Sequence, residues 1–294
     1  MTNVNRETHV AVLGLGLIGQ GMASSLLNAG FSVTVYNRSR EKCEPFAGRG
    51  ARIAATPRDA ASEADVLICI VADDNASRHV WTGDEGALLG AKPGSILIDA
   101  GTLSVAWILE LAAAADEQDC ALLDAPVTGS REQAAAGELT FLVGGAGDIL
   151  ERARPVFEAT GKRILHMGPQ GSGAMMKIVN NFLCGVQAAS LSEAIGLIER
   201  SGLDREKARE MLETGAPASP LVKILYERMT DRDYTPQFHL KLMAKDLSYA
   251  IGEGERLDLA LRTAPAARSI FDDARDGARG DDDFSAIVEQ FRAG

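Results

Sequence analysis

The chain has 294 residues, an apolar content of 46%, a formal net charge of −11 and a sequence pI near 4.9. That length suits one large domain or two ordinary ones, and the apolar content can fill a core in each. The negative charge argues against nucleic acid or an anionic membrane surface as a partner, although a local basic patch would still suit a phosphorylated small molecule.

No export signal, membrane span or metal site is expected. The N-terminal segment is polar and then strand-like, unlike a secretory signal, which favours a cytoplasmic protein. Polar residues interrupt the longest apolar stretch, and the cysteines and histidines are too scattered for metal or disulfide spacing. The interrupting residues are Lys177, Asn180, Asn181, Gln187 and Glu193; the cysteines, expected to be reduced structural thiols, are Cys43, Cys69, Cys120 and Cys184; the histidines are His9, His79, His166 and His239.

Short β-rich runs alternate with helical segments from residue 9 to about residue 166. This alternation indicates parallel strands joined by right-handed crossovers, so we expect a doubly wound α/β sheet. The expected strands are HVAVLG at 9–14, SVTVYN at 32–37, DVLICIV at 65–71, SILIDAG at 95–101, CALLDAPV at 120–127, LTFLVGG at 139–145 and RILHMG at 163–168.

After GPQGSG at residues 168–173 the pattern is helical to the end of the chain. The segment 172–200 would be roughly 43 Å long as one continuous helix, which is long enough to link two domains. We therefore expect an α/β domain at 1–167 and an all-helical domain at 168–294. The other expected helices are 204–214, 219–230, 238–254, 258–277 and 283–292.

A glycine-rich turn, VAVLGLGLIGQGM, follows the first expected strand and opens the first expected helix. Gly14, Gly16 and Gly19 have the G-x-G-x-x-G spacing that permits a tight turn, a close approach of the backbone to a pyrophosphate, and close packing of helix against strand. The N–H groups at the helix start then attract the phosphate charge. We predict a dinucleotide-binding turn that also includes Leu15, Leu17 and Ile18.

The end of the second expected strand indicates which dinucleotide is bound. A carboxylate there would accept hydrogen bonds from an unmodified ribose, but the sequence places Asn37 at that point. The guanidinium of Arg38 can instead hold a 2′-phosphate through two hydrogen bonds. Asn37, Arg38 and Ser39 are therefore predicted to bind NADP; the alternative is that Arg38 and Arg40 are solvated charges at a helix start.

Two further loops follow strand ends, where open α/β sheets bind their ligands. Val71 and Ala72 are small enough for a cofactor to lie against the backbone, and Thr102 offers a hydroxyl at the start of a helix. Cofactor binding is predicted for all three residues, although Thr102 suits a helix cap equally well.

Three polar residues lie inside the apolar run GSGAMMKIVNN at 171–181. Asn180 and Asn181 follow Lys177 by three and four positions, so on a helix the three side chains share one face. A polar arc on a helix that is otherwise apolar indicates a polar site.

These motifs together resemble the β-hydroxyacid dehydrogenase family, which includes 3-hydroxyisobutyrate dehydrogenase, tartronate semialdehyde reductase and the glyoxylate/succinic semialdehyde reductases. The resemblance covers nearly the whole chain and implies an N-terminal Rossmann-like domain followed by an all-helical domain. The matching stretches are GLGLIGQGM, NRS, DAPVTGS with GELTFLVGG, GPQGSGAMMKIVNN and LMAKDLSYA.

The resemblance implies that Lys177 is the catalytic lysine. During reduction the carbonyl oxygen gains negative charge, which an ammonium group can stabilise and protonate. Burial should lower the pKa of Lys177 from the solution value of about 10.4, because desolvation disfavours the charged form. Asn181 would orient the substrate or the lysine, and Asn180 either shares that role or makes a structural hydrogen bond.

DAPVTGS resembles the substrate-anchoring loop of the family, and Thr128, Gly129 and Ser130 match the positions that receive the substrate carboxylate. Adjacent amides and hydroxyls suit an anion. Many members have a second glycine in place of Ser130, and the variant found here is more similar to the glyoxylate/succinic semialdehyde reductase branch. Arg131 is better interpreted as a solvated loop residue.

In the helical half, Lys245 resembles the lysine that reaches the cofactor. Phe238 is a candidate wall of the substrate pocket, with core packing as the favoured alternative. Asp246 is interpreted as a local cap or ion-pair partner without a catalytic part.

The sequence thus predicts an NADPH-preferring oxidoreductase that reversibly reduces a short aldehyde or 2-oxo acid bearing a carboxylate, with glyoxylate and succinic semialdehyde as leading substrates. Tartronate semialdehyde and 3-hydroxyisobutyrate remain open. The rivals are an imine reductase, which generally carries another residue in place of Lys177, and a non-catalytic dinucleotide-binding scaffold. The apolar helical half and the resemblance both suggest a homodimer or homotetramer.

Overall fold

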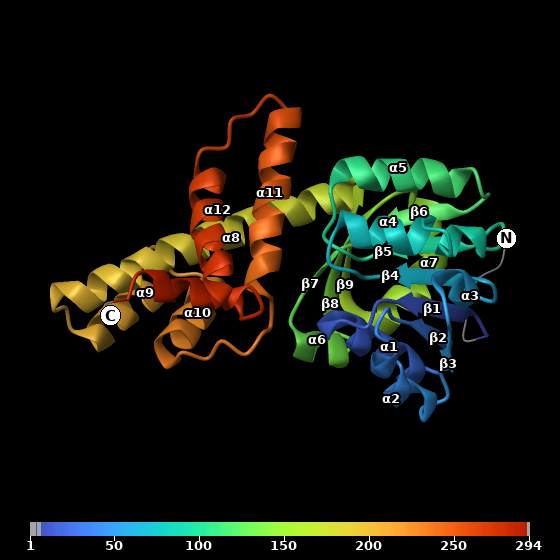
Figure 1. Cartoon of the computed structure of the whole chain (residues 1–294), viewed down its shortest axis with the longest axis horizontal. Coiled ribbons are helices and arrows are strands. Elements are labelled where there is room, and N and C mark those ends of the chain that lie inside the picture. Colours follow the sequence, from blue (N-terminus) through green and yellow to red (C-terminus); the bar gives the residue numbers. More distant parts are fainter. Residues whose placement is uncertain (1–3, 5–6, 293–294) are drawn as a thin grey trace. The chain divides into compact units, whose positions relative to one another are not determined.

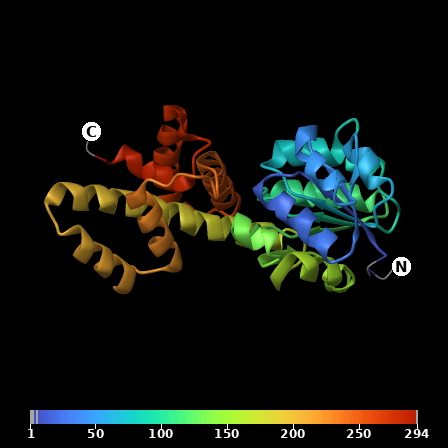
Figure 2. The same cartoon turned by 90° about the horizontal axis from the view of Figure 1, so that it is seen from below.

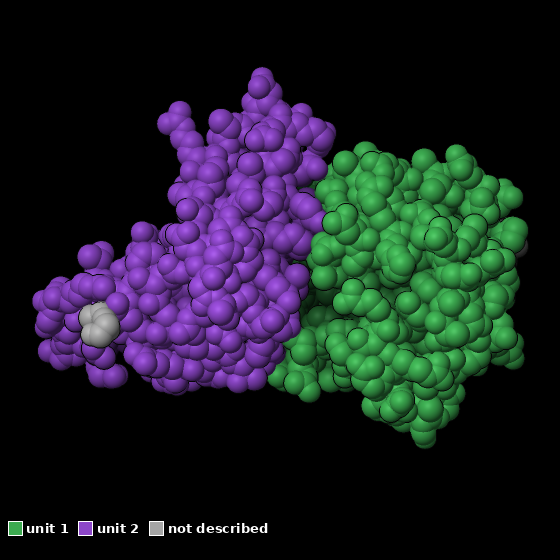
Figure 3. Space-filling model, in the orientation of Figure 1, with its two compact units in different colours: residues 1–177 green, residues 178–294 purple. Residues whose placement is uncertain are grey.

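The structure is a computed structural model that describes residue 4 and residues 7–292 (Figure 1). The chain divides into two compact units, residues 1–177 (unit 1) and 178–294 (unit 2) (Figure 3). The division falls inside helix α8 (Ser172–Ser201), ten residues beyond the predicted domain boundary at 167. The predicted α/β half followed by a helical half is confirmed.

Unit 1 is built on a nine-stranded sheet in the order β3-β2-β1-β4-β5-β6-β8-β7, with β9 paired to β8. The central strands are buried along their whole length because helices cover both faces of the sheet, which explains their unbroken apolar sequences (Figure 2). The strands are β1 His9–Leu13, β2 Ser32–Tyr36, β3 Arg52–Ile53, β4 Val66–Cys69, β5 Ile96–Asp99, β6 Ala121–Asp124, β7 Val127–Thr128, β8 Leu139–Gly144 and β9 Gly161–Gly168.

The predicted doubly wound α/β sheet is confirmed, but β8 departs from the expected parallel strands and runs antiparallel to both β6 and β7. The reason is the short connection between β7 and β8. It holds only the five-residue helix α6 (Arg131–Ala135), whereas a parallel return usually needs a crossover of a dozen or more residues. The run predicted as one strand at 120–127 is also divided into β6 and β7.

Several helices of unit 1 begin at a side-chain cap. Asp73, Ser104 and Ser130 each accept a hydrogen bond from a backbone N–H of the first turn that follows. The helices are α1 Leu17–Asn28, α2 Glu44–Ala47, α3 Pro57–Ala61, α4 Asp74–Thr82, α5 Val105–Asp116, α6 and α7 Gly147–Thr160, with 3₁₀ turns at Arg40–Lys42 and Ala87–Leu89.

Helix α8 is continuous over 30 residues, which corresponds to roughly 45 Å. By length and apolar composition alone it could cross a membrane, so the interrupting polar residues, contrary to expectation, do not exclude a span. Core helices of proteins outside membranes pass the same test, and Ala188, Leu191 and Ile195 of α8 belong to the core of unit 2.

Unit 2 packs helices around a core that includes Leu225, Met229, Leu247 and Phe271. One predicted helix, 258–277, is wrong at its start: Asp258 has a left-handed φ of 54°, and the helix begins five residues later. The remaining elements are α9 Arg205–Thr214, α10 Pro220–Asp231, α11 Leu240–Arg256, α12 Thr263–Ala274, a π-helical turn at Arg275–Arg279 and a 3₁₀ helix at Phe284–Gln290.

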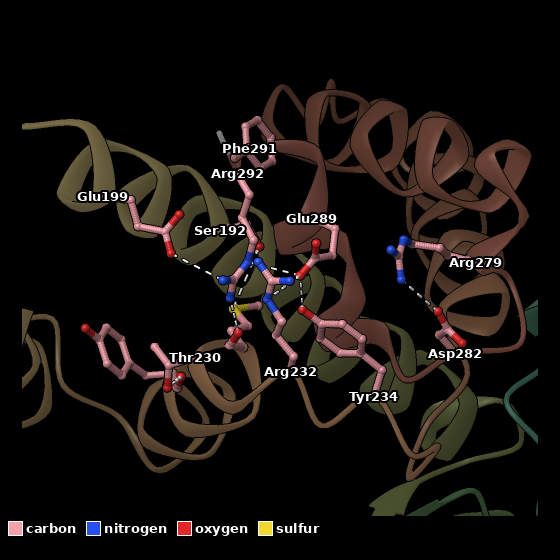
Figure 4. Close-up of polar contacts among 12 residues, drawn as sticks. Ser192, Glu199, Thr230, Arg232, Tyr234, Arg279, Asp282, Glu289, Phe291 and Arg292 are labelled. Atoms are coloured by element: carbon pink, nitrogen blue, oxygen red, sulfur yellow. Dashed lines mark hydrogen bonds and ion pairs between the residues drawn. The ribbon is translucent and has the colours of Figure 1, made fainter. Parts of the chain in front are cut away.

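Charged side chains anchor the C-terminal segment of unit 2 (Figure 4). Arg292 forms ion pairs with Glu289 at 3.0 Å and with Glu199 of α8 at 3.4 Å, and it donates a hydrogen bond to the carbonyl of Met229. Tyr234 donates to the same Glu289, and burial raises the pKa of its phenol. These contacts tie the segment after α12 to α8 and α10.

Candidate active site

The glycine turn contains two glycines that the fold requires and one that it does not. Gly14 has a φ of +103°, and a Cβ there would lie 2.3 Å from the carbonyl oxygen of Ile70; a Cβ on Gly19 would lie 2.0 Å from the carbonyl oxygen of Gly14. Gly16 is exposed, and a Cβ there would meet nothing within 4 Å. Gly16 therefore keeps open the space through which a pyrophosphate would approach the start of α1.

Gly16 is also the N-cap of α1 and has no side chain to bond the first N–H groups of the helix. These residues thus fit a dinucleotide. Within the same predicted turn Leu15 is fully buried, while Leu17 and Ile18 are half-buried.

Asn37 joins the end of β2 to the glycine turn, a role that the sequence did not reveal. Its side-chain oxygen accepts from the N–H of Leu15 at 2.9 Å, and its amide nitrogen donates to the carbonyl of Ser39 at 3.0 Å. Arg38 and Arg40 are both exposed on the same loop. The structure therefore brings the predicted 2′-phosphate residues next to the predicted pyrophosphate turn.

The loops after β4 and β5 lie side by side in unit 1. A Cβ on Gly101 would lie 3.2 Å from the carbonyl oxygen of Val71, and Thr102 comes directly after Gly101. Val71 and Thr102 are half-buried, and Ala72 is exposed. The three residues predicted from strand ends are thus gathered at one edge of the sheet.

A buried carboxylate holds the loop that carries Thr102. Asp99 accepts hydrogen bonds from the N–H of Gly101 at 2.9 Å, the hydroxyl of Ser77 at 2.8 Å and the indole N–H of Trp81 at 2.8 Å. Burial raises the pKa of Asp99 against the effect of these donors. The role of this aspartate was not predicted from the sequence.

The loop Thr128–Ser130 leads from β7 into α6. Ser130 forms a capping box with Gln133: its N–H donates to the side-chain oxygen of Gln133 at 2.8 Å, and its hydroxyl accepts from the Gln133 N–H at 3.3 Å. The serine hydroxyl can still donate to a ligand while it accepts this bond. Gly129 has a φ of +147° and is exposed, and Thr128 is half-buried.

Lys177 and Asn181 lie one turn apart on α8, and both are buried, with 9% and 4% of their surface exposed. Asn180 is half-buried and donates from its amide nitrogen to the side-chain oxygen of Asn181 at 3.0 Å. The polar arc predicted from helical spacing therefore exists.

In unit 2 the side chain of Asn181 is held by Asp246. Its amide nitrogen donates to Asp246 Oδ2 at 2.5 Å, and Lys245 Nζ forms an ion pair with Asp246 Oδ1 at 2.9 Å. The Lys245 ammonium also lies 4.5 Å from the ring centroid of Tyr249, within cation–π distance. Asp246 is fully buried and links two of the predicted site residues.

The local ion pair of Asp246 agrees with the sequence interpretation, whereas its bond to Asn181 was not predicted, although a signal was present. Met243, Leu247 and Ala250 are apolar and spaced for one helix face, and Asp246 falls on that face. An aspartate among core positions needs a partner, because a buried charge without one is costly.

Phe238 packs edge to face on Phe284, with ring centroids 5.8 Å apart, and lies against the core of unit 2. This is the core packing favoured as the alternative; its predicted contact with substrate stays a prediction. Among the residues that the structure describes, no group of three or more His, Cys, Asp or Glu is arranged to hold a metal ion.

Two family models match the chain and together span almost all of it. The NAD binding domain of 6-phosphogluconate dehydrogenase matches residues 9–168. The model described as NAD-binding of NADP-dependent 3-hydroxyisobutyrate dehydrogenase matches residues 171–291.

Similar proteins are found among characterised sequences and solved structures. Glyoxylate/succinic semialdehyde reductase 2 of Arabidopsis thaliana is 33% identical over 97% of this chain and 79% of its own length. NAD-dependent L-serine dehydrogenase of Pseudomonas aeruginosa is 36% identical over 82% of this chain and 83% of its own. The crystal structure of 3-hydroxyisobutyrate dehydrogenase from Salmonella typhimurium has a TM-score of 0.88 at 30% identity, covering 97% of this chain and all of the other.

Some relatives are longer. The chain is 31% identical to the cytokine-like nuclear factor N-PAC of Homo sapiens over 97% of its own residues, but it spans only 52% of that protein.

Proposed function

Because the chain belongs to the β-hydroxyacid dehydrogenase family, we propose that it is an NADPH-preferring reductase of short aldehydes or 2-oxo acids that bear a carboxylate. Family membership makes it an oxidoreductase that acts on hydroxyacids with a nicotinamide dinucleotide. Glyoxylate and succinic semialdehyde are the proposed substrates, and the reaction is reversible.

The observation that carries the proposal is the pair of buried polar residues on α8, Lys177 and Asn181, the second held by Asp246. When bound, the reduced nicotinamide supplies the hydride for the carbonyl carbon. Lys177 would stabilise the negative charge that develops on the carbonyl oxygen and donate a proton to it. Asp246 accepts a hydrogen bond from the amide nitrogen of Asn181, which keeps that side chain from rotating freely. The side-chain oxygen of Asn181 would therefore point in the same direction in every turnover.

The loop Thr128–Ser130 would bind the substrate carboxylate. The threonine and serine hydroxyls and the exposed Gly129 backbone are donors suited to an anion, and the capping box keeps the start of α6 in place around them. Ser130 favours glyoxylate and succinic semialdehyde over the other candidate substrates. The 33% identity to a glyoxylate/succinic semialdehyde reductase supports this choice.

The preference for NADP rests on Arg38 and on the amide at Asn37. An amide does not repel a 2′-phosphate, and an exposed arginine beside the glycine turn can bind it. One relative is named as NAD-dependent, so the cofactor has to be tested directly. Arg38→Ala should raise KM for NADPH far more than KM for NADH, and Arg40→Ala, an exposed arginine two residues away, should do so much less. Equal effects of Arg38→Ala on both cofactors would reject the assignment.

The substrate test is the oxidation of NADPH, followed by its ultraviolet absorbance, with glyoxylate, succinic semialdehyde, tartronate semialdehyde, methylmalonate semialdehyde and a cyclic imine. Turnover of an acidic carbonyl is expected, and turnover of the imine alone would reject the proposal. The strong structural likeness to 3-hydroxyisobutyrate dehydrogenase makes oxidation of 3-hydroxyisobutyrate the second candidate. Strong NADPH binding without any turnover would favour a non-catalytic scaffold.

Lys177→Ala should lower turnover by roughly 10² to 10⁴-fold, the usual contribution of a positioned proton donor, while cofactor binding persists. Lys223→Ala, which removes an exposed lysine from α10, is the matched control and should leave turnover unchanged. Turnover of Lys177→Ala within a few-fold of the parent protein would mean that another group donates the proton.

We also propose that two copies associate through the helical unit. None of the ten residues of α9 is buried, although Leu212 packs against the core of unit 2, and a helix this short depends on packing for its stability. Nearby Leu197 and Met211 are 72% and 62% exposed, so a second copy would cover them. Light scattering at micromolar concentration should give a dimer or tetramer. The double variant Leu197→Glu with Met211→Glu should shift the protein toward monomer. The control Leu89→Glu, at an exposed leucine of unit 1, should leave the oligomeric state unchanged.

A further inference from the structure

Asp124, the last residue of β6, is fully buried and binds the start of α8. Its Oδ1 accepts from the N–H of Gly171 at 2.8 Å and from the side-chain amide of Gln170 at 3.1 Å. Its Oδ2 accepts from the N–H of Ala174 at 2.8 Å. The N–H groups at a helix start have no partner within the helix, so this carboxylate acts as a cap that comes from a distant strand.

The first turn of α8 also rests directly on the ends of the strands. A Cβ on Gly173 would lie 2.2 Å from the carbonyl oxygen of Leu142 in β8 and 2.6 Å from that of Asp124. No side chain fits between, so backbone lies against backbone at this point. Lys177 follows Gly173 by four positions and therefore lies on the same face of the helix.

The same aspartate begins the segment that leads to the proposed carboxylate loop. The chain continues through buried Ala125 and Pro126 into β7, and the carbonyl of Pro126 accepts from the N–H of Leu142 at 3.0 Å. Thr128 ends β7. Asp124 therefore binds the start of the helix that carries Lys177 and also begins the segment that leads to the loop Thr128–Ser130.

We propose that Asp124 is a positioning residue, whose carboxylate fixes the first turn of α8 relative to the Thr128–Ser130 loop and so sets where Lys177 meets a carbonyl. This inference rests on the proposed function of Lys177. Asp124 itself touches neither substrate nor cofactor in this role; it acts through the helix that it caps.

The cap requires both oxygens of a carboxylate. An asparagine has a single side-chain acceptor, and its NH₂ group would face either the Gly171 or the Ala174 N–H, two donors against each other. Burial raises the pKa of Asp124 to about 6, against the lowering effect of the Gly171 and Ala174 N–H groups. At neutral pH the protein thus keeps a buried anion here, and the hydrogen bonds from the helix start offset its desolvation only in part.

The test is Asp124→Asn, compared with Val156→Ala, a core substitution in α7 that weakens unit 1 away from the site. Turnover should fall roughly 10²-fold, the effect expected of a displacement near 1 Å, while KM for NADPH stays that of the parent. Val156→Ala should leave turnover near the parent value at a temperature where both variants are folded. Unchanged turnover in Asp124→Asn, or an equal loss in both variants, would overturn the proposal.

Two further measurements keep the proposal testable if Asp124→Asn folds poorly or no substrate is turned over. Gln170→Ala removes one donor to Asp124 and should lower turnover several-fold without unfolding the chain. Amide hydrogen exchange over residues 171–177 needs no substrate and should be faster in Asp124→Asn and Gln170→Ala, but not in Val156→Ala. Unchanged exchange would overturn the cap, whereas faster exchange in an enzyme inactive on every carbonyl would reject the proposed function alone.

Discussion

Asp124 in unit 1 and Asp246 in unit 2 are both fully buried carboxylates that bind helix α8, which carries the predicted catalytic side chains, but their partners differ. Asp124 is held by neutral donors, two backbone N–H groups and one side-chain amide. Asp246 accepts from Asn181 and pairs with the ammonium of Lys245. A buried anion can thus be stabilised by oriented dipoles or by a counter-charge. Substitutions and changes of pH should affect the stability of the two arrangements differently.

The largest effect is expected where a buried ion pair is broken. Asp246→Asn keeps an acceptor for Asn181 but removes the ion pair with Lys245, and breaking a buried pair typically costs about 3 to 5 kcal/mol. The lower end applies here, because 18% of the Lys245 side chain is exposed. Urea unfolding measures the loss. The double variant Asp246→Asn with Lys245→Met removes both charges and should recover much of it; a double variant less stable than the single one would contradict the ion-pair interpretation.

A pH-dependent effect is expected for Asp124, because its pKa is about 6 in the folded chain and 3.8 ordinarily. The native state therefore keeps this proton at pH values where the unfolded chain has lost it. The associated stability is fully present below pH 3.8 and is lost as pH rises through about 6. A shift of about two units corresponds to about 3 kcal/mol.

Urea unfolding between pH 4 and 7 would measure this dependence as the difference between the parent protein and Asp124→Asn. The difference should fall as pH rises. A difference that increases with pH would mean that the N–H donors outweigh burial and that the folded chain favours the ionised form of Asp124, which would contradict the raised pKa.

Much of unit 1 follows from local patterns. Apolar runs locate the main strands within a few residues, and the G-x-G-x-x-G spacing identifies the turn in which Gly16 alone faces open space. Helical spacing also places Lys177 and Asn181 on one arc, because a periodicity of 3.6 residues needs no tertiary information. What these features share is that each depends on residues close in sequence.

The missed features depend on residues far apart. Asp124 and Ala174 are separated by 50 positions, and Asn181 and Asp246 by 65. The spacing of nearby residues does not show which distant residues will pair. Asp124 lies at the end of an apolar strand, where its sequence neighbours give no sign of a helix as its partner. Alternation of strands and helices predicts parallel strands, and it does not reveal that the connection from β7 to β8 is too short for a parallel return.

The smallest effect is expected at Asp99, which sits opposite Asp124 in the register of β5 and β6 and is also held by neutral donors. Asp99→Asn should cost about 1 to 3 kcal/mol, the penalty for leaving a buried donor unsatisfied. The chain has two tryptophans: Trp81 bonds Asp99, and Trp107 bonds Ser77, so tryptophan fluorescence should change with the substitution.

Asp99 and Asp124 also differ in the element that each holds in place. Since Asp99 fixes Gly101 and the adjoining Thr102, whereas Asp124 fixes the helix of Lys177, Asp99→Asn should raise KM for the cofactor and leave turnover at saturation nearly intact. Steady-state kinetics on both variants separates the two roles. If both substitutions lowered turnover alike, the carboxylates would act on one shared structure, and the division of the strand ends into a cofactor loop and a catalytic helix would have to be abandoned.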